Sequence, residues 1–278
     1  MNKREIVGYA RYQIGKFGRK EPDFLSIYFH DPAPKTFTSI LEWCKKKSYR
    51  FITLQECYAI LSGKIRQEGK VAYLSFDDGW QSNLNLIPII DKYQAPITIF
   101  VSIDPLLSGN FWWEYALADG IELRNKMKLM SYKKFVSSLE SLKKKYSLER
   151  SVLTEQELVK IASHPLVSIQ SHTMSHPILT NCEDEILSYE LNSSKAYLEN
   201  LLHHKIEAFS YPNGNFSNRE IEAVKKAGYK MAFTTEYIPI QINHTNLYRI
   251  PRMAMNTYGG YYENLSKILG IWQDILKK

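Results

Sequence analysis

Two adjacent carboxylates, Asp77 and Asp78, stand at the end of an apolar run, residues 71–75. Successive side chains of a strand point to opposite sides, so the two aspartates can take different tasks in one pocket as the strand ends. Each carboxylate raises the pKa of the other unless a cation offsets their charges. Asp-Asp-Gly, completed by Gly79, is also an ordinary turn sequence. The pair alone therefore indicates either a metal-dependent site or a turn.

Two histidines four residues apart, His172 and His176, follow a second β-like run at residues 166–170. Two imidazoles at this spacing can meet one ion, and a nearby carboxylate makes three ligands. Three ligands leave one coordination position open for water, which is typical of catalytic zinc. Thr173 stands where His-Glu-x-x-His metalloproteases carry their general base, so the base must come from elsewhere, and Asp77 is available. A lone histidine pair is often a surface feature, but together with the aspartates it favours a metal site.

Segments 74–79 and 171–177, Leu-Ser-Phe-Asp-Asp-Gly and Ser-His-Thr-Met-Ser-His-Pro, resemble the first two motifs of the polysaccharide deacetylase (NodB-like) family of carbohydrate esterases in order and spacing. Segment 209–214 is similar, more loosely, to the family's groove motif. The resemblance covers about residues 25 to 255. It implies an α/β fold, a distorted (β/α) barrel in a single domain. We assign residues 25–278 to this catalytic domain and residues 1–24 to a basic N-terminal extension.

The resemblance also implies one divalent metal, zinc by our expectation, held by Asp78, His172 and His176, with Asp77 as general base. The metal would polarise the acetamide carbonyl and acidify its water, and the backbone N–H of Asn213 would help to hold the oxyanion. We expect substrate-binding residues in the groove motif, namely Tyr211, Pro212, Asn213 and Gly214.

The chain departs from the family pattern at the proton donor. The family carries a Leu-x-His near the C-terminus that supplies the general acid, whereas no histidine follows His244 here. His30, at the end of the strand-like run 25–29, resembles the strand-end histidine of a family branch that acts on exopolysaccharides and takes its acid from the front of the chain. We therefore expect His30 to be the acid and keep His244 in reserve. The alternative is that His30 caps its loop together with Asp31.

A second departure concerns an arginine that the family places at the position of Ser210, bonded to the catalytic aspartate. Segment 248–252 is expected to be a strand with two guanidinium groups near the pocket, and we favour Arg252 over Arg249 as the replacement. The alternative is that both arginines are solvated or structurally paired. Flat faces for sugar rings are offered by Trp80, Trp112 and Trp113, although adjacent aromatic residues also serve as core or loop anchors.

Length and composition agree with one enzyme domain. The chain has 278 residues, of which 44% are hydrophobic. Its three cysteines, Cys44, Cys57 and Cys182, form no Cys-x-x-Cys pair, which favours reduced thiols and a cytoplasmic location. The start of the chain shows no apolar run long enough for a signal peptide. The net charge of +7 is spread along the chain without a nucleic-acid-binding motif, so nucleic acid is not an expected partner.

Residues 1–20 carry six basic side chains against only Glu5, with apolar residues interspersed. Such a segment could rest on anionic lipid headgroups at the inner membrane surface, or form a helix packed on the barrel. Elsewhere, helices are expected at 36–47, 84–93 and 183–202, and after the capping boxes at 154–157 and 217–220; strands are expected at 51–54, 97–101 and 229–234. The charged stretch 119–150 is expected to be a helical insertion beside the cleft.

The sequence leaves several functions open. The first is a metal-dependent hydrolase, acting on carbon–nitrogen bonds other than peptide bonds, that removes N-acetyl groups from the amino sugars of a cell-surface polysaccharide (exopolysaccharide, capsule or lipopolysaccharide) or its lipid-linked precursor. The second is a carbohydrate-binding protein whose chemistry has decayed, and an O-acetyl esterase is the third. The intact set of Asp77, Asp78, His172 and His176 argues for the enzyme.

Overall fold

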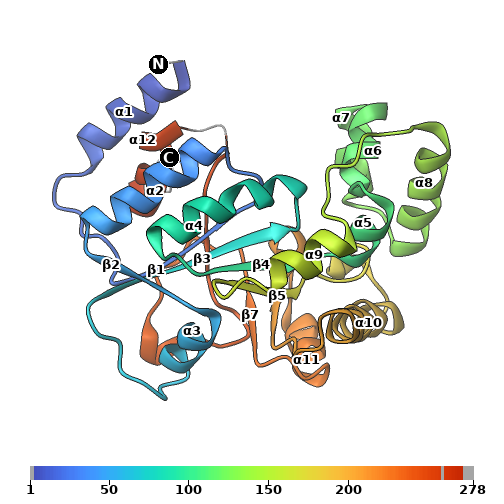
Figure 1. Ribbon diagram of the computed structural model, residues 1–278. Coiled ribbons are helices and arrows are strands. Elements are labelled where there is room, and N and C mark those ends of the chain that lie inside the picture. The colour runs from blue at the N-terminus through green and yellow to red at the C-terminus, as the bar shows by residue number, and fades with distance from the viewer. Residues whose placement is uncertain (1–2, 258–259, 272–278) are drawn as a thin grey trace.

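Eight parallel strands form the centre of the protein (Figure 1). The computed structural model describes residues 3–257 and 260–271. Along the sheet the order is β7-β6-β5-β4-β3-β1-β8, and β2 pairs with β3. The strands are β1 (Phe24–Phe29), β2 (Tyr49–Ile52), β3 (Lys70–Asp78), β4 (Ile97–Val101), β5 (Val167–Ser171), β6 (Ala208–Ser210), β7 (Met231–Phe233) and β8 (Met253–Ala254).

The central strands are buried on both faces, as their apolar composition predicts. Every residue of β1 and β4 is buried, and so is every residue of β3 after Lys70. Continuous Val, Ile, Leu and Phe runs of this kind are typical of parallel strands that helices cover on the outside. The register places Asp78 beside Val101 and Val101 beside Ser171. The ends of β3, β4 and β5 therefore lie level, which brings the two sequence motifs to the same rim.

The segment after residue 246 closes the sheet into a distorted (β/α) barrel. Ile250 donates its N–H to Ala232 of β7 (2.9 Å), and β8 a few residues later pairs with β1. The segment thus joins the two edge strands of the sheet. The strand expected at 248–252 was misplaced, because only Met253–Ala254 are strand and Arg252 lies just before them.

The five predicted helices are present. They are α2 (Pro34–Lys46), α4 (Ile87–Tyr93), α9 (Glu155–Ala162), α10 (Asp184–Leu202) and α11 (Asn218–Lys226), and both capping boxes are formed. A further helix, α3 (Leu54–Leu61), was not expected from the sequence. The expected helix 84–93 instead begins as the 3-10 helix η1 (Gln81–Leu86), and the α-helix starts only at Ile87 with a proline in its first turn. The strand expected at 51–54 ends at Ile52 because the Thr53 side chain caps α3 by accepting from the Glu56 N–H (3.1 Å).

A helical insertion stands to one side of the barrel between β4 and β5 (Figure 1). It contains α5 (Ile103–Ser108), α6 (Trp112–Asp119), α7 (Ile121–Met127) and α8 (Tyr132–Lys145). Its own small core holds Trp112, Tyr115, Met127, Phe135 and Leu142. The prediction of a helical insertion at 119–150 is confirmed, and the insertion begins earlier, directly after β4.

At the opposite side, α1 (Lys3–Gly15) lies along α12 (Gly260–Ile268) (Figure 1). Gly8 permits the close approach, because a Cβ there would come within 3.0 Å of the Glu263 backbone nitrogen. The N-terminal segment therefore packs on the domain, the second of the two alternatives, while Ile14 and Phe17 stay about four-fifths exposed (80% and 79%). No described helix is long and apolar enough to cross a membrane. The three cysteines are buried free thiols.

Candidate active site and metal centre

A cleft of about 600 Å³ opens at the carboxyl ends of the strands, where (β/α) barrels place their active sites. Both motif aspartates and both motif histidines line it. Asp77 and Asp78 end β3, and His172 directly follows β5. Asp78, Thr173 and His176 adopt positive φ angles (82°, 75° and 55°), which are uncommon for residues other than glycine. Such local strain is typical of functional sites.

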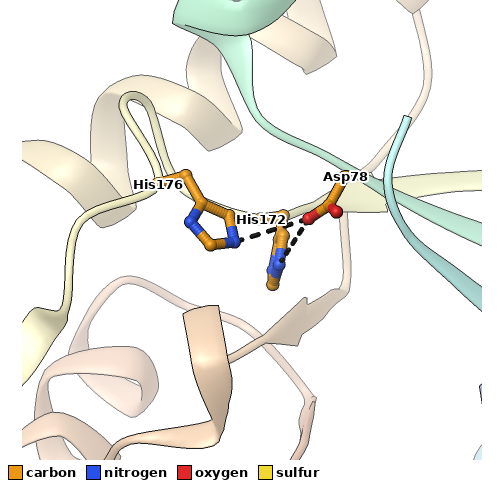
Figure 2. Close-up of side chains that lie close together, drawn as sticks. All are labelled: Asp78, His172 and His176. Atoms are coloured by element: carbon orange, nitrogen blue, oxygen red, sulfur yellow. Dashed lines mark ion pairs between the residues drawn. The ribbon is translucent and has the colours of Figure 1, made fainter. Parts of the chain in front are cut away.

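Asp78, His172 and His176 converge on one point (Figure 2). Asp78 Oδ1 lies 3.6 Å from His172 Nε2 and 3.4 Å from His176 Nε2. Ligand atoms at zinc distances of about 2.0–2.2 Å lie roughly 3.3 Å apart in a tetrahedral set, so the spacing fits a small divalent cation. Asp78 Oδ2 accepts from Trp80 Nε1 (3.0 Å), whereas the buried Oδ1 accepts no hydrogen bond from the described residues. A bound cation would satisfy this orphaned oxygen.

Outer contacts fix the ring of His172 and the backbone of His176. His172 Nδ1 donates to the Ser210 carbonyl (2.7 Å), which leaves the lone pair of Nε2 facing Asp78. Burial lowers the pKa of His172 to about 4, so the imidazole is neutral near pH 7, as a metal ligand must be. The Trp112 Nε1 donates to the His176 carbonyl (3.0 Å) and fixes the loop from the side of the insertion.

Glu190 of α10 binds the loop that carries His176. Its carboxylate accepts from the N–H groups of Met174 (2.8 Å) and Ser175 (2.9 Å) and from the Ser175 hydroxyl (2.6 Å). Tyr132 of the insertion also donates to it (3.2 Å). Burial raises the pKa of Glu190, and the hydrogen bonds from Ser175 partly oppose this. The sequence offered no signal for Glu190, because a helical glutamate normally faces solvent.

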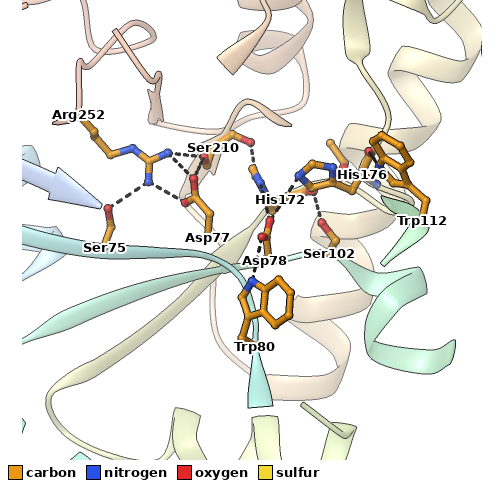
Figure 3. Close-up of polar contacts among 11 residues, drawn as sticks. Ser75, Asp77, Asp78, Trp80, Ser102, Trp112, His172, His176, Ser210 and Arg252 are labelled. Carbon is orange, nitrogen blue, oxygen red and sulfur yellow. Dashed lines mark hydrogen bonds and ion pairs between the residues drawn. The ribbon is translucent and has the colours of Figure 1, made fainter. Parts of the chain in front are cut away.

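Asp77 points to the other side of β3, into a bidentate pair with Arg252 (Figure 3). Arg252 donates to both carboxylate oxygens at 2.8 Å, and it also donates to Ser75 Oγ (3.0 Å), Ser210 Oγ (2.7 Å) and the Thr234 carbonyl (3.3 Å). All five guanidinium N–H donors thus have acceptors. Burial raises the pKa of Asp77, but several opposing interactions, the charge of Arg252 foremost, together outweigh burial and keep that pKa below its ordinary value.

The family model for polysaccharide deacetylases matches residues 64–232, which is more than half of the chain. The chain belongs to the polysaccharide deacetylase family. Curated relatives include a Bacillus subtilis protein assigned to the polysaccharide deacetylases, YxkH (25% identical over 239 residues, 83% of this chain and 70% of the relative), and a Staphylococcus aureus poly-beta-1,6-N-acetyl-D-glucosamine N-deacetylase (26% over 222 residues, 79% and 66%).

Solved structures of the family share this fold. The deacetylase PplD of Streptococcus pyogenes superposes with a TM-score of 0.66 at 21% identity, over 90% of this chain and 99% of that one. IcaB from Ammonifex degensii gives a TM-score of 0.64 at 17% identity, over 88% and 98%. At these identities the likeness shows the fold, the distorted barrel that the resemblance implied.

The arginine that this deacetylase lacks at position 210 has a spatial substitute. Ser210 is small and fully buried, and its hydroxyl accepts from the Arg252 guanidinium, which comes from the segment that closes the barrel. Arg252 is wholly buried, so it offers no surface to substrate and contacts Asp77 instead. Arg249 pairs with Glu236 on the surface instead (2.8 and 2.5 Å).

His30 lines the cleft from the end of β1 and is exposed. Its ring packs edge-on against Tyr28 at 5.4 Å between centroids. Asp31 is bound by Ser82 and not by the His30 ring, and Asn83 donates to the His30 carbonyl (3.0 Å). His244 lies in the 3-10 helix η4 (Ile242–His244) and is not among the residues that line the cleft.

The three tryptophans all reach the cleft, one of them buried and two half-buried. Trp112 is buried (4% exposed) and supports the His176 loop. Trp113 is half-buried; its ring stacks on Phe111 (4.4 Å between centroids) and meets the His176 ring edge-on (4.7 Å). Trp80 is half-buried beside the metal ligands. Trp80 and Trp113 therefore retain surface that a sugar can contact.

The groove motif presents only Asn213 to the cleft. Asn213 lies in η3 (Pro212–Gly214) in a left-handed conformation (φ 56°). Tyr211 and Pro212 are buried, and the Tyr211 hydroxyl donates to the Tyr248 carbonyl (3.1 Å). Gly214 is required by space, since a Cβ there would lie 1.9 Å from the Thr235 hydroxyl. These three residues shape the loop and do not face substrate.

Four further residues line the cleft that the sequence did not single out: Tyr28, Arg124, Lys128 and Thr235. Tyr28 precedes His30 on β1, and its ring lies 4.5 Å from the Arg252 guanidinium. Arg124 and Lys128 come from α7 and its C-terminal end in the insertion. Lysines and arginines are common on exposed helices, so only the fold could single these two out.

Proposed function

We propose that this polysaccharide deacetylase is a metal-dependent hydrolase that removes N-acetyl groups from amino sugars of a cell-surface polysaccharide or its precursor. The observation that carries the proposal is the separation of the two adjacent carboxylates into different environments. Asp78 faces two imidazoles with an unsatisfied oxygen, and Asp77 is paired with a buried arginine. The names of the staphylococcal relatives support N-acetylglucosamine as the sugar.

Asp78, His172 and His176 would hold one divalent ion, and zinc is our expectation. Such an ion, when bound, polarises a carbonyl oxygen and lowers the pKa of a water molecule. Asp77 then accepts the proton of the attacking water, because the Arg252 charge keeps its carboxylate ionised near neutral pH. Asn213 lines the cleft, and we propose that its backbone N–H donates to the developing oxyanion.

The leaving amine must be protonated, because an amide anion does not depart from the tetrahedral intermediate. His30 is the donor that we propose, since among the described histidines it lines the cleft without belonging to the metal set. Trp80 and Trp113 would hold the sugar ring by apolar contact. The bonding of Asp77 to Arg252 disfavours a decayed binding protein, because binding a sugar needs no ionised, buried carboxylate.

The direct test is acetate release from chains of N-acetylglucosamine by the purified full-length protein with added zinc. We expect release that stops when a chelator removes the metal and returns when metal is restored. Asp77→Asn serves as the inactive control. An O-acetylated sugar assayed alongside separates an amidase from an esterase. Release from the O-acetylated sugar alone, or no release from either, would contradict the proposal.

We further propose that residues 1–20 touch a membrane surface from the cytoplasmic side. The support is the exposure of Ile14 and Phe17 (80% and 79%) close in sequence to the basic residues 16, 19 and 20, which follow α1. Cosedimentation with vesicles of anionic and of neutral lipid tests this, with Ile14→Ser/Phe17→Ser as the variant. Equal sedimentation of the variant and the parent with anionic vesicles would contradict the membrane proposal and would leave the catalytic proposal unchanged.

A further inference from the structure

We infer that the cleft takes a saccharide that carries an anionic group, a phosphate ester or a carboxylate, near the acetylated nitrogen, and that Arg124 and Lys128 bind this anion. The inference rests on the proposed function and narrows its substrate class. Both side chains line the same cleft as the metal ligands, and both are half-buried.

The two cations have no acidic partner among the described residues. Arg124 donates through Nε and Nη2 to the neutral amide oxygen of its neighbour Asn125 (3.2 and 2.7 Å). Lys128 Nζ donates to the neutral amide oxygen of Asn213 (2.8 Å), the residue whose backbone faces the reacting carbonyl in our proposal. Burial and the charge of Arg124 both lower the pKa of Lys128, as expected for two like charges without a counterion.

The acidic groups that line the cleft do not balance the charges of Arg124 and Lys128. In the described part of the chain, only Asp77 and Asp78 line it with negative charge. Arg252 neutralises Asp77, and a divalent ion would more than neutralise Asp78. The charges of Arg124 and Lys128 are therefore left over, and a cleft with surplus positive charge selects anionic ligands.

The position of Lys128 is fixed by the fold, unlike that of a freely solvated lysine. The preceding Met127 is buried in the core of the insertion, and the Asn181 side chain donates to the Lys128 carbonyl (2.9 Å). Asn181 belongs to η2 (Leu179–Asn181), a few residues after His176. Lys128 is thus tied to the metal-binding loop and keeps a defined place relative to it.

A different explanation of the same charges is repulsion of the product, since deacetylation creates a cationic amine. That explanation and anion recognition predict different kinetics. Repulsion acts on every substrate alike, because every substrate yields an ammonium group. Recognition acts only on substrates that carry the anion. The choice of substrates can therefore separate them.

The experiment compares three chains of N-acetylglucosamine of equal length: the neutral chain, the chain with one 6-O-phosphate, and the chain with one C6 hydroxymethyl group oxidised to a carboxylate. We measure kcat/KM for the parent, Arg124→Gln, Lys128→Met and the matched control Lys126→Met. Lys126 lies on the same helix but is exposed and does not line the cleft. The same chains are titrated calorimetrically into the full-length protein with its metal chelated, where no turnover consumes them.

We expect the parent to favour at least one anionic chain by about tenfold or more, the scale of a charge-assisted contact in partial solvent. Arg124→Gln and Lys128→Met should each reduce that ratio by about tenfold, and salt should weaken it, while Lys126→Met retains it. Comparison of the phosphorylated chain with the oxidised chain shows which anion the cleft prefers. Equal kcat/KM and equal affinity for the three chains would overturn the inference, as would variants that slow all three chains alike. Absence of turnover on every chain would instead refute the proposed function, and the titration would still decide the inference.

Discussion

Arg252 and Asp77 are 175 residues apart in the chain and meet as a buried, bidentate ion pair, with both N–O distances at 2.8 Å. Asp77 ends the β3 strand, and Arg252 lies in the segment that closes the barrel. The two adjacent aspartates therefore lie in different environments: Arg252 orients the Asp77 carboxylate, whereas the Asp78 carboxylate faces His172 and His176.

Replacing Arg252 should impair turnover and shift its pH dependence. Arg252→Met leaves Asp77 buried without its cation, so the pKa of Asp77 rises and the acid limb of the pH–rate profile moves to higher pH. Arg252→Lys should not rescue fully, because an ammonium group cannot reproduce the bidentate geometry. Profiles of both variants check this. An unchanged acid limb in Arg252→Met would show that Arg252 does not control the ionisation of the base.

The same pair should make stability depend on acid pH. The folded-state pKa of Asp77 is below its unfolded value near 4, so the stabilisation is complete above that value and is lost as pH falls through the folded-state pKa. Arg252→Met should cost about 3–5 kcal/mol of unfolding free energy at pH 7 and less at pH 3. Urea titrations at the two pH values measure it. Arg249→Met, whose partner Glu236 lies near the surface, is the control and should cost about 1 kcal/mol or less.

Metal content should follow the three converging ligands. His172→Ala and His176→Ala should each lose the ion, because two remaining ligands do not hold zinc at micromolar concentration. Elemental analysis of the dialysed proteins gives the answer, with the exposed His204→Ala as control. Full metal content in His172→Ala or in His176→Ala would show that the replaced histidine is not a metal ligand.

Asp77→Asn should retain the ion and lose about 10² or more in kcat, the usual scale for deleting a proton-transfer group. Asp78→Asn should lose the ion. Measuring both quantities on both variants separates a base from a ligand. The opposite pattern would exchange the two roles.

His30 should govern the alkaline limb of activity, because a general acid must be protonated to work. His30→Ala should lose that limb and most of its rate, while His244→Ala should keep both, since His244 does not line the cleft. Rates across pH for the two variants provide the comparison. Near-normal rates in His30→Ala would show that water or another group, and not His30, donates the proton.

Glu190 should matter for metal affinity although it binds no metal. Glu190→Ala leaves the N–H groups of Met174 and Ser175 without their acceptor, so the His176 loop loosens and metal affinity should fall about 10- to 100-fold. Glu190→Gln should recover part of it by accepting at one oxygen. Competition with a chelator measures the affinity, and the exposed Glu185→Ala on the same helix is the control. Parent-like affinity in Glu190→Ala would limit Glu190 to a stability role.

The sequence determined whatever depends on short segments. The apolar run before Asp77 predicted β3, because a parallel strand buried on both faces is rich in apolar residues. The short β-like run 166–170 predicted the strand before His172. The capping boxes at Thr154 and Ser217 predicted two helix starts, because the cap is a contact between residues three apart. The metal set was proposed from the two motifs and the family that they resemble, and the structure shows that their strands end at the same rim.

Only the tertiary structure decided what joins distant segments. It selected Arg252 over Arg249 for Asp77, because barrel closure places one guanidinium inside and leaves the other facing Glu236. It buried Tyr211 while leaving Asn213 in the cleft, a distinction made by packing and a left-handed turn. The cleft contacts of Arg124 and Lys128 arise because the insertion folds back over the rim, and no local pattern encodes where a helix between two strands will dock.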